Sequence, residues 1–408
     1  MQRWQLASWI ESVEFAETLA ELTTQPVTHH TLLRLRRRFE RSRAELIYEI
    51  LQVRAIAHRK FSRGCEMLMT RRGWEQSSGQ VVGSWKARRF QLTPRVIDLC
   101  CGVGGDALAL AGAADEVAVV DRDPLMVAMA RANCGVYDRS CAAGIVASCE
   151  EFPLATNFVW HLDPDRRAAQ NRTVHLERMT PRGAWIRELV QRCPTGALKL
   201  APATEFPTDW ASTAEATWIS HYGECRQLVL WFGELVRHRG RRVAVRLDDA
   251  GEVHEWIGAD GKVTEKPLRL TTHVGSLVME LDPALLAAGL AADFLCQHEC
   301  FGLTRGGGYA TTDELAPSIV PWVQAYTVDT VLPLRLPAVE KWLRKSRLYL
   351  GEVKQRGTDV RPQEWLKRVG RRRLSGDART LLAMRVDSRA IAVIGERVVG
   401  NGRQHRVS

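Results

Sequence analysis

One stretch constrains the fold of this 408-residue chain more than any other, because it joins two apolar runs through a glycine-rich loop. Residues 95–124 read RVIDLCCGVGGDALALAGAADEVAVVDRDP. Glycine lets a backbone approach a ligand where a side chain would block it, and the helix that follows can receive an anion at its first turn. The stretch therefore predicts a strand, a nucleotide-binding loop, a helix and a second strand.

Apolar runs and helical segments continue to alternate after this loop. We expect six strands before residue 250, with the sequences RVIDLC, EVAVVD, FVWHLDP, GALKLAP, ATWISHY and RRVAVRL. The expected helices include ALALAGA, PLMVAMARANC and CRQLVLWFGELVRHR. Such alternation is typical of a mostly parallel sheet covered by helices on both faces. The predicted fold class is α/β, with a Rossmann-like doubly wound sheet.

The glycine loop alone leaves two ligands open. From Gly102 it satisfies G-x-G-x-x-A, so NAD is one candidate. Against NAD, Asp98 ends the first strand where a dinucleotide site usually has an apolar residue, and no second glycine loop follows. A carboxylate at Asp98 suits the amino group of S-adenosylmethionine. Asp121, at the end of the second strand, can accept hydrogen bonds from both hydroxyls of a ribose.

The segment VIDLCCGVGGDALALA followed by VVDRDP resembles motifs I and II of the class I S-adenosylmethionine-dependent methyltransferases. Cys100 stands where their D-x-G-x-G-x-G pattern has its first glycine, a departure shared with the trimethylguanosine synthase branch. Further blocks, between about residues 55 and 395, resemble bacterial methyltransferases that carry a C-terminal THUMP-like domain. The resemblance implies S-adenosylmethionine as the cofactor and methyl transfer as the reaction.

The resemblance also implies which residues hold the cofactor. Asp98 and the loop backbone would hold the methionine moiety, Asp121 the ribose, and Glu150 the adenine amino group. Residues before the sheet would fold over the cofactor as a lid, although simple core packing is an equal explanation for the aromatic residues there. The expected cofactor-binding residues are Lys60, Thr70, Asp98, Cys100, Gly102, Gly104, Asp121, Arg122 and Glu150.

The fourth predicted strand ends in LDPDRR. In amino-methylating members of the resembled class, an Asn, Asp or Ser followed by Pro accepts hydrogen bonds from the target amine, so Asp163 and Pro164 are the expected catalytic residues. The aromatic residue that commonly follows and stacks on a target base is replaced here. Arg166 and Arg167 could instead bind a phosphate or carboxylate of the substrate. The alternative is a strand-ending turn with a surface salt bridge.

Changes in composition and in expected secondary structure along the chain predict five segments. They are an N-terminal helical region (1–60), a cofactor lid or linker (61–94), the methyltransferase domain (95–250), a connecting region (251–329) and a THUMP-like α+β domain (330–408). The first segment places Leu32, Leu35, Phe39, Leu46, Ile50 and Val53 at helical spacing. The connecting region should contain a hairpin that turns at Asp260-Gly261.

The charge balance is basic, with 57 Lys and Arg against 47 Asp and Glu, a net charge of +10. Basic runs near the C-terminus, which include Arg371, Arg372 and Arg373, favour a partner rich in phosphate, such as tRNA or rRNA. The first hypothesis is thus an RNA methyltransferase. The alternatives are a methyltransferase for a small molecule or protein, whose tail serves dimerisation or capping, and a non-catalytic RNA-binding protein.

The ten cysteines show no CxxC pair, and their scatter fits a reducing cytoplasm. Cys296, His298 and Cys300 offer three metal ligands without a fourth nearby, so we expect no metal site. We expect neither a signal peptide nor a membrane span, because the N-terminus lacks the required pattern and no run approaches 18 apolar residues.

Overall fold

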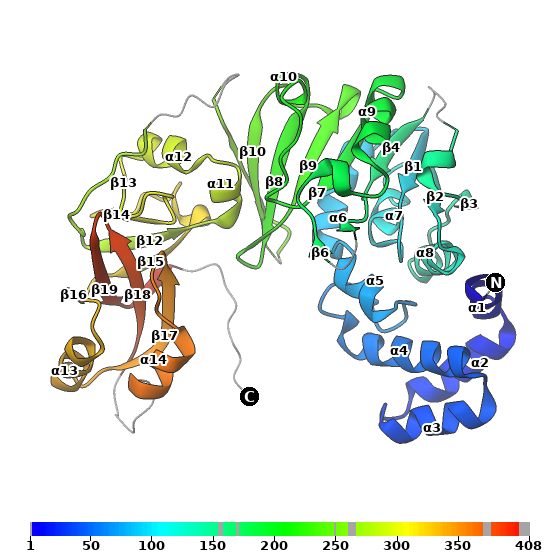
Figure 1. Cartoon of the computed structure of the whole chain (residues 1–408), viewed down its shortest axis with the longest axis horizontal. Coiled ribbons are helices and arrows are strands. Elements are labelled where there is room, and N and C mark those ends of the chain that lie inside the picture. The colour runs from blue at the N-terminus through cyan, green and yellow to red at the C-terminus, as the bar shows by residue number, and fades with distance from the viewer. Residues whose placement is uncertain are drawn as a thin grey trace. The chain divides into compact units, whose positions relative to one another are not determined.

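The computed structural model describes residues 2–153, 158–168, 171–248, 250–259, 267–369 and 377–399, without the side chains of residues 167, 168, 171, 172 and 399 (Figure 1). The chain divides into two compact units. The first comprises Met1–Glu215 and Leu228–Arg239, and the second comprises Ala216–Gln227 and Gly240–Ser408. In the described part of the chain, no helix has the length and hydropathy that a membrane span requires.

The first unit begins with helices. They are α1 (Gln2–Ile10), α2 (Val13–Thr23), α3 (His29–Arg38), α4 (Arg41–Ala57), α5 (Arg71–Gln76) and α6 (Gln80–Ala87), and a 3-10 turn at Arg88–Phe90 follows. The apolar residues expected on one helical face are buried in α3 and α4, except Leu32, which is partly exposed. Helix α1 lies against α8 (Pro124–Val136), and Arg3 forms an ion pair with Asp123 just before α8.

A nine-stranded sheet has the order β11-β10-β8-β9-β7-β4-β1-β2-β3, and its strands β10 and β11 belong to the second unit. Its strands are β1 (Arg95–Leu99), β2 (Glu116–Asp121), β3 (Ala143–Val146), β4 (Val159–Leu162), β7 (Gly196–Leu200), β8 (Glu215–His221), β9 (Glu224–Phe232), β10 (Arg242–Leu247) and β11 (Val253–Ile257). The helices in this region are α7 (Gly105–Leu110), α8, α9 (Gly183–Arg192) and α10 (Trp210–Thr213). The five adjacent strands β7-β4-β1-β2-β3 run parallel to one another, as expected for a doubly wound sheet.

Shorter elements complete this part of the chain. The two-residue strands β5 (Arg167–Ala168) and β6 (Asn171–Arg172) pair with each other. Short 3-10 turns lie at Cys149–Glu151, Leu176–Arg178 and Gly233–Leu235.

Our prediction of a helix in CRQLVLWFGELVRHR was wrong, because this segment forms β9. Its apolar run Leu228–Phe232 is buried and pairs antiparallel with β7. Tyr222 and Gly223, both with positive φ (55° and 69°), form the tight turn that joins β8 to β9. A continuous apolar run is compatible with either a buried strand or a buried helix, so local sequence alone did not distinguish them.

The second unit contains two smaller sheets. A five-stranded sheet has the order β13-β14-β12-β15-β20, and a four-stranded sheet has the order β16-β19-β18-β17. Their strands are β12 (Leu277–Leu281), β13 (Phe301–Gly302), β14 (Tyr309–Thr312), β15 (Val323–Thr327), β16 (Thr330–Pro333), β17 (Tyr349–Arg356), β18 (Ala378–Val386), β19 (Arg389–Gly395) and β20 (Arg397–Val399). The helices are α11 (Pro283–Ala287), α12 (Ala291–Gln297), α13 (Leu336–Ser346) and α14 (Pro362–Val369), with a 3-10 turn at Val320–Trp322.

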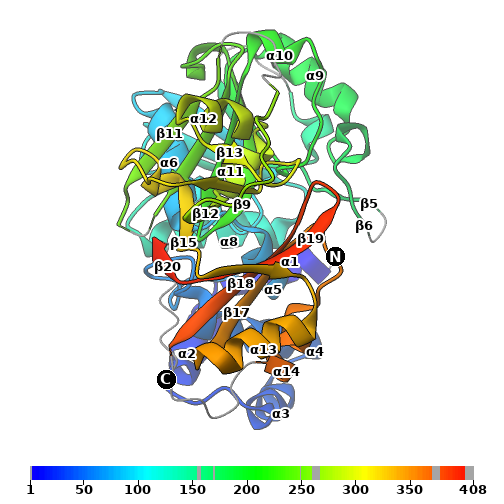
Figure 2. The same cartoon turned by 90° about the vertical axis from the view of Figure 1, so that its left-hand side faces the viewer.

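The four-stranded sheet is buried on both faces. On one face, side chains of β18 and β19 form a core with Val278, Tyr309 and Tyr326 of the five-stranded sheet. On the other face, Val339 and Leu343 of α13 are buried, and α14 packs against the same core (Figure 2). The strand Val253–Ile257 pairs with β10, while the turn expected at Asp260-Gly261 lies outside the described residues.

Candidate functional site

The carboxyl ends of β1, β2 and β4 bring the expected site residues of the sheet together. In an open parallel sheet, loops from neighbouring strands meet at this edge and form the ligand crevice. Asp98 pairs in register with Val119 of β2 and with His161 of β4. The backbone N–H of Asp163 donates to the carbonyl oxygen of Leu99 at 3.2 Å, which holds the end of β4 beside the glycine loop.

Three residues of the glycine loop adopt a left-handed backbone. The φ values are +60° at Cys100, +53° at Gly102 and +81° at Gly104. Left-handed φ costs a non-glycine residue roughly 1–2 kcal/mol. Cys100 therefore keeps the conformation that a glycine would adopt most easily, which explains why the D-x-G-x-G-x-G pattern has glycine at this position.

The two expected close-approach glycines differ in their surroundings. A Cβ atom on Gly104 would lie 2.8 Å from Cα of Ala130, so this glycine is required for the loop to pack against α8. A Cβ atom on Gly102 would meet nothing within 4 Å. Open space above Gly102 is what a ligand that approaches the backbone requires.

Asp98 is buried and only half satisfied. Its Oδ1 lies 2.7 Å from Nδ1 of His161, whereas Oδ2 has no hydrogen-bond partner among the described residues. Burial raises the pKa of Asp98, and the nearby His161 opposes that shift. A buried carboxylate oxygen without a partner is costly, so this atom suits an additional donor such as a ligand amino group.

Asp121 lies at the end of β2 and shapes the loop. Its Oδ2 accepts the backbone N–H of Gly102 at 3.0 Å, and its Oδ1 accepts that of Asp123 at 2.9 Å. Burial raises the pKa of Asp121, although both backbone donors counteract it. Each carboxylate oxygen can accept more than one hydrogen bond, so the expected contact with ribose hydroxyls remains chemically available.

The predicted adenine side of the site combines Glu150 with a thiol contact. Glu150 is exposed on the 3-10 turn after β3, and its Oε1 accepts the backbone N–H of Arg182 at 3.0 Å. Sγ of Cys149 lies 3.3 Å from Sγ of Cys100, which joins this turn to the glycine loop. A hydrogen bond with Cys149 and burial both raise the pKa of Cys100.

The expected lid residues Lys60 and Thr70 contact the two ends of helix α5. Lys60 donates from Nζ to the carbonyl oxygens of Trp74, Glu75 and Ser77 at 2.6, 3.2 and 3.0 Å, which neutralises the C-terminal end of α5. Thr70 caps the other end, because its hydroxyl accepts the N–H of Gly73 at 3.0 Å. Both residues therefore stabilise helix α5 itself.

Arg122 and Arg72 converge on Asp165 after β4. The guanidinium of Arg72, from α5, lies 3.2 Å from Oδ2 of Asp165, and that of Arg122 lies 3.7 Å from the same oxygen. Asp165 stands where a stacking aromatic residue was expected by resemblance. Arg166 is half-buried, the side chain of Arg167 is outside the described part of the chain, and Arg371, Arg372 and Arg373 also lie outside it.

Asp163 contacts Lys199, which lies near the carboxyl end of β7. Nζ of Lys199 lies 2.6 Å from Oδ2 of Asp163 and 3.5 Å from Oδ2 of Asp106. Pro164 is buried directly after Asp163. The sequence analysis missed His161, Lys86 and Asp106, although a titratable residue in an otherwise apolar strand, such as His161 in FVWHL, is a usable signal.

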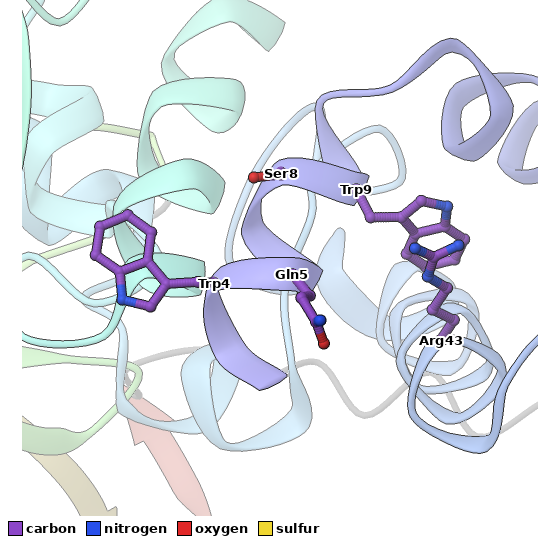
Figure 3. A pocket seen from close by; sticks show the side chains of 5 residues that line it. All are labelled: Trp4, Gln5, Ser8, Trp9 and Arg43. Carbon is purple, nitrogen blue, oxygen red and sulfur yellow. The ribbon is translucent and has the colours of Figure 1, made fainter. Parts of the chain in front are cut away.

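Two other groups of side chains belong to other elements of the chain. The ring of His298, in the CQHEC segment, packs against Phe294 with 4.8 Å between ring centroids. A shallow hollow of about 400 Å³ lies between α1 and α4, lined by Trp4, Gln5, Ser8, Trp9 and Arg43 (Figure 3). The guanidinium of Arg43 covers the Trp9 ring at 4.9 Å. None of these residues belongs to the glycine loop or to the strand ends.

Parts of the chain match known protein families, and its fold resembles a solved structure. Residues 93–160 match the family model described as RNA cap guanine-N2 methyltransferase, and residues 323–397 match the one described as THUMP domain-like. Two relatives from Mycobacterium tuberculosis, strains CDC 1551 and H37Rv, are described as uncharacterized S-adenosylmethionine-dependent methyltransferases. Each is 27% identical over 269 residues, which is 62% of this chain and 68% of the relative. A crystal structure assigned as a methyltransferase from Porphyromonas gingivalis W83 superposes with a TM-score of 0.73 at 16% identity, over 97% of this chain and 98% of its own.

Proposed function

We propose that this chain, which is a class I S-adenosylmethionine-dependent methyltransferase with a C-terminal THUMP-like domain, methylates an amino nitrogen of a base in structured RNA. The observation that carries this proposal is the position of Asp163-Pro164. They follow β4 directly, and the Asp163 backbone is bonded to Leu99 at the start of the glycine loop. The matched family described as RNA cap guanine-N2 methyltransferase supports an amino nitrogen as the target.

The residues of the crevice fit the cofactor. Oδ2 of Asp98, which is buried without a partner among the described residues, would accept the amino group of the methionine moiety. The open space over Gly102 would admit the part of the cofactor that contacts the loop backbone, and Asp121 would bind the ribose. Cys100, Gly104, Arg122 and Glu150 would complete the crevice, with α5, held by Lys60 and Thr70, as its cover. When bound, the cofactor supplies an electrophilic methyl group on sulfur.

The protein's part in this reaction is positioning. An amine attacks a methyl group in line, and holding the reacting atoms in line can remove about 7–11 kcal/mol of a barrier. Asp163 would accept a hydrogen bond from one N–H of the target amine, and thereby aim the nitrogen lone pair at the methyl group. Pro164 is buried and has no N–H, so it fixes the backbone next to Asp163 without a donor of its own.

Exposed basic side chains in the THUMP-like domain support an RNA substrate. Helices α13 and α14 bury apolar residues against the four-stranded sheet and leave a basic outer face. The exposed cationic residues there are Lys341, Arg344, Lys345, Arg347, Lys367 and Arg368. Phosphate contacts by such residues supply affinity for tRNA or rRNA without sequence specificity. By sequence, Arg371, Arg372 and Arg373 extend this basic run.

We assign a task to each segment accordingly. Residues 1–60 and 330–408 would grip RNA, residues 61–94 would cover the cofactor, residues 95–250 would carry the chemistry, and residues 251–329 would connect them. Because all ten cysteines are free thiols, we place the protein in a reducing cytoplasm.

Tritium transfer tests the function. The purified chain with labelled S-adenosylmethionine is offered total RNA from cells that lack the protein, and in parallel RNase-treated extract, with Asp163→Ala as the control variant. We expect label in RNA that the Asp163→Ala variant does not transfer. Replacement of Arg371–Arg373 by serine should lower the salt slope of RNA binding by about 1 per lost phosphate contact. Label that survives RNase would reject RNA as the acceptor.

A second candidate is a methyltransferase for a small molecule or a protein. The observation that favours it is Asp165, which occupies the position of the expected stacking aromatic residue and binds Arg72 and Arg122. A small anionic substrate could replace Asp165 as the partner of these guanidinium groups. The RNase-treated arm of the same assay would detect this substrate class.

A further inference from the structure

A buried row of charged side chains connects α6 to the end of β4. Nζ of Lys86 lies 2.6 Å from Oδ1 of Asp106, and Oδ2 of Asp106 lies 3.5 Å from Nζ of Lys199. Lys199 in turn lies 2.6 Å from Oδ2 of Asp163. The side chains of Lys86, Asp106 and Lys199 are at most 9% exposed, whereas that of Asp163 is 29% exposed. The row therefore opens to solvent at Asp163.

The two lysines differ in their electrostatic surroundings. Burial lowers the pKa of Lys86, and its ion pair with Asp106 does not offset that effect. Burial would also lower the pKa of Lys199, but Asp163 and Asp106 together raise it above its ordinary value. Burial acts against ionisation of Asp106 as well, yet Lys86 and Lys199 hold its pKa well below its usual range. Lys199 thus lies between two carboxylates that both favour its charged form.

We propose that Lys199 is a positioning residue for methyl transfer, which holds Oδ2 of Asp163 so that Oδ1 is left to accept the target amine. This inference rests on the proposed function of Asp163. Among the described residues, Oδ1 of Asp163 accepts no hydrogen bond, so the ammonium uses one oxygen and leaves the other. Oδ2 of Asp106 also contacts Nζ of Lys199, and the hydroxyl of Ser78 donates to this oxygen at 2.8 Å.

The geometry distinguishes positioning from proton transfer. Nζ of Lys199 lies 2.6 Å from Oδ2 of Asp163 and 3.5 Å from Oδ2 of Asp106, and both carboxylates favour its protonated form over a role as a base. A half-exposed aspartate without such a partner would sample several rotamers, and a displacement of about 1 Å at a reacting group can cost roughly 100-fold in rate. Holding Asp163 in one rotamer is the contribution that the ammonium can make.

The test compares variants in steady-state methylation of total RNA from cells that lack the protein. We expect Lys199→Met to lower kcat roughly 10- to 100-fold and to leave the affinity for S-adenosylhomocysteine, measured by calorimetry, unchanged. Lys199→Arg, which retains the charge, should recover part of the loss. Lys86→Met is the matched control, because it removes a buried ammonium from Asp106 without touching Asp163, and its loss of kcat should be much smaller.

A double-mutant cycle gives the decisive comparison. If Lys199 acts through Asp163, Lys199→Met combined with Asp163→Asn should be no slower than Asp163→Asn alone. Additive losses, or an equal loss in Lys86→Met, would overturn the inference. If Lys199→Met does not fold, Lys199→Gln takes its place. Absence of label in RNA with the wild-type chain would instead reject the RNA substrate, and the same variants would then be compared on the fraction that accepts label.

Discussion

Gly102 and Gly104 of the glycine loop should separate stability from ligand binding. Both have positive φ, so an alanine at either position costs roughly 1–2 kcal/mol of conformational strain. At Gly104 the added Cβ would also approach Ala130 to 2.8 Å at Cα and 2.9 Å at Cβ. Such overpacking typically costs about 1–3 kcal/mol more. We therefore expect Gly104→Ala to destabilise the protein by about 2–5 kcal/mol, and Gly102→Ala by only about 1–2 kcal/mol.

Relative to the stability that each variant loses, Gly102→Ala should weaken ligand binding more than Gly104→Ala does. The Cβ of an alanine at position 102 would enter open space within the crevice, where the cofactor backbone contact is expected. Gly102→Ala should then weaken binding of S-adenosylhomocysteine at least tenfold, or about 1.4 kcal/mol, while most of the folded population remains. The N–H that donates to Asp121 is unaffected by this substitution.

Urea unfolding of the ligand-free variants and calorimetric titration with S-adenosylhomocysteine measure the two quantities separately. Cys100→Ser should be measured with these variants, because serine keeps a small side chain at Cys100, the one non-glycine residue among the three left-handed positions of the loop. The reasoning would be refuted if Gly102→Ala unfolded at as low a urea concentration as Gly104→Ala. Wild-type affinity in Gly102→Ala would refute the placement of the ligand over this loop.

Three further outcomes follow from local contacts. Glu215→Gln should destabilise the protein by about 3–5 kcal/mol, because it leaves the buried guanidinium of Arg89 without its anion. Burial would raise the pKa of Glu215, but Arg89 and two backbone donors lower it overall. The stabilisation by Glu215 is therefore complete above pH about 4.3 and is lost as pH falls through the folded-state pKa. The urea midpoints of the wild-type and Glu215→Gln forms, measured between pH 3 and 7, should converge only at the acid end. Lys60→Met should speed amide exchange within residues 71–77 roughly 10- to 100-fold, since a hydrogen bond to a charged group contributes about 1.5–3 kcal/mol; unchanged exchange by mass spectrometry would show that α5 needs no cap. Cys100→Gly should change the urea midpoint little, because relief of the left-handed strain and the added chain entropy nearly cancel, whereas Cys100→Val should lower it clearly.

Local sequence was enough to predict most strands of the sheet and the glycine loop. Each of the strands β1, β2, β4, β7, β8 and β10 was predicted, because a short apolar run bounded by turn residues is recognisable without its neighbours. Asp98 and Asp121 could be proposed for the same reason, since the ends of adjacent parallel strands meet at one edge. The match to methyltransferase families then identified the reaction, but it left the substrate open.

Other features depended on residues that are far apart in the sequence. The segment of β9 reads equally well as a helix, and only its position beside β7 made it a strand. Lys86, Asp106 and Lys199 come from three separate elements, and each alone resembles an ordinary charged residue. The amino-acid order by itself determined the succession of strands and the backbone of the glycine loop, because these features depend on residues that are neighbours in the sequence. The tertiary structure decided which charges meet in the interior, because the energy of a buried charge depends on partners that only folding brings within reach.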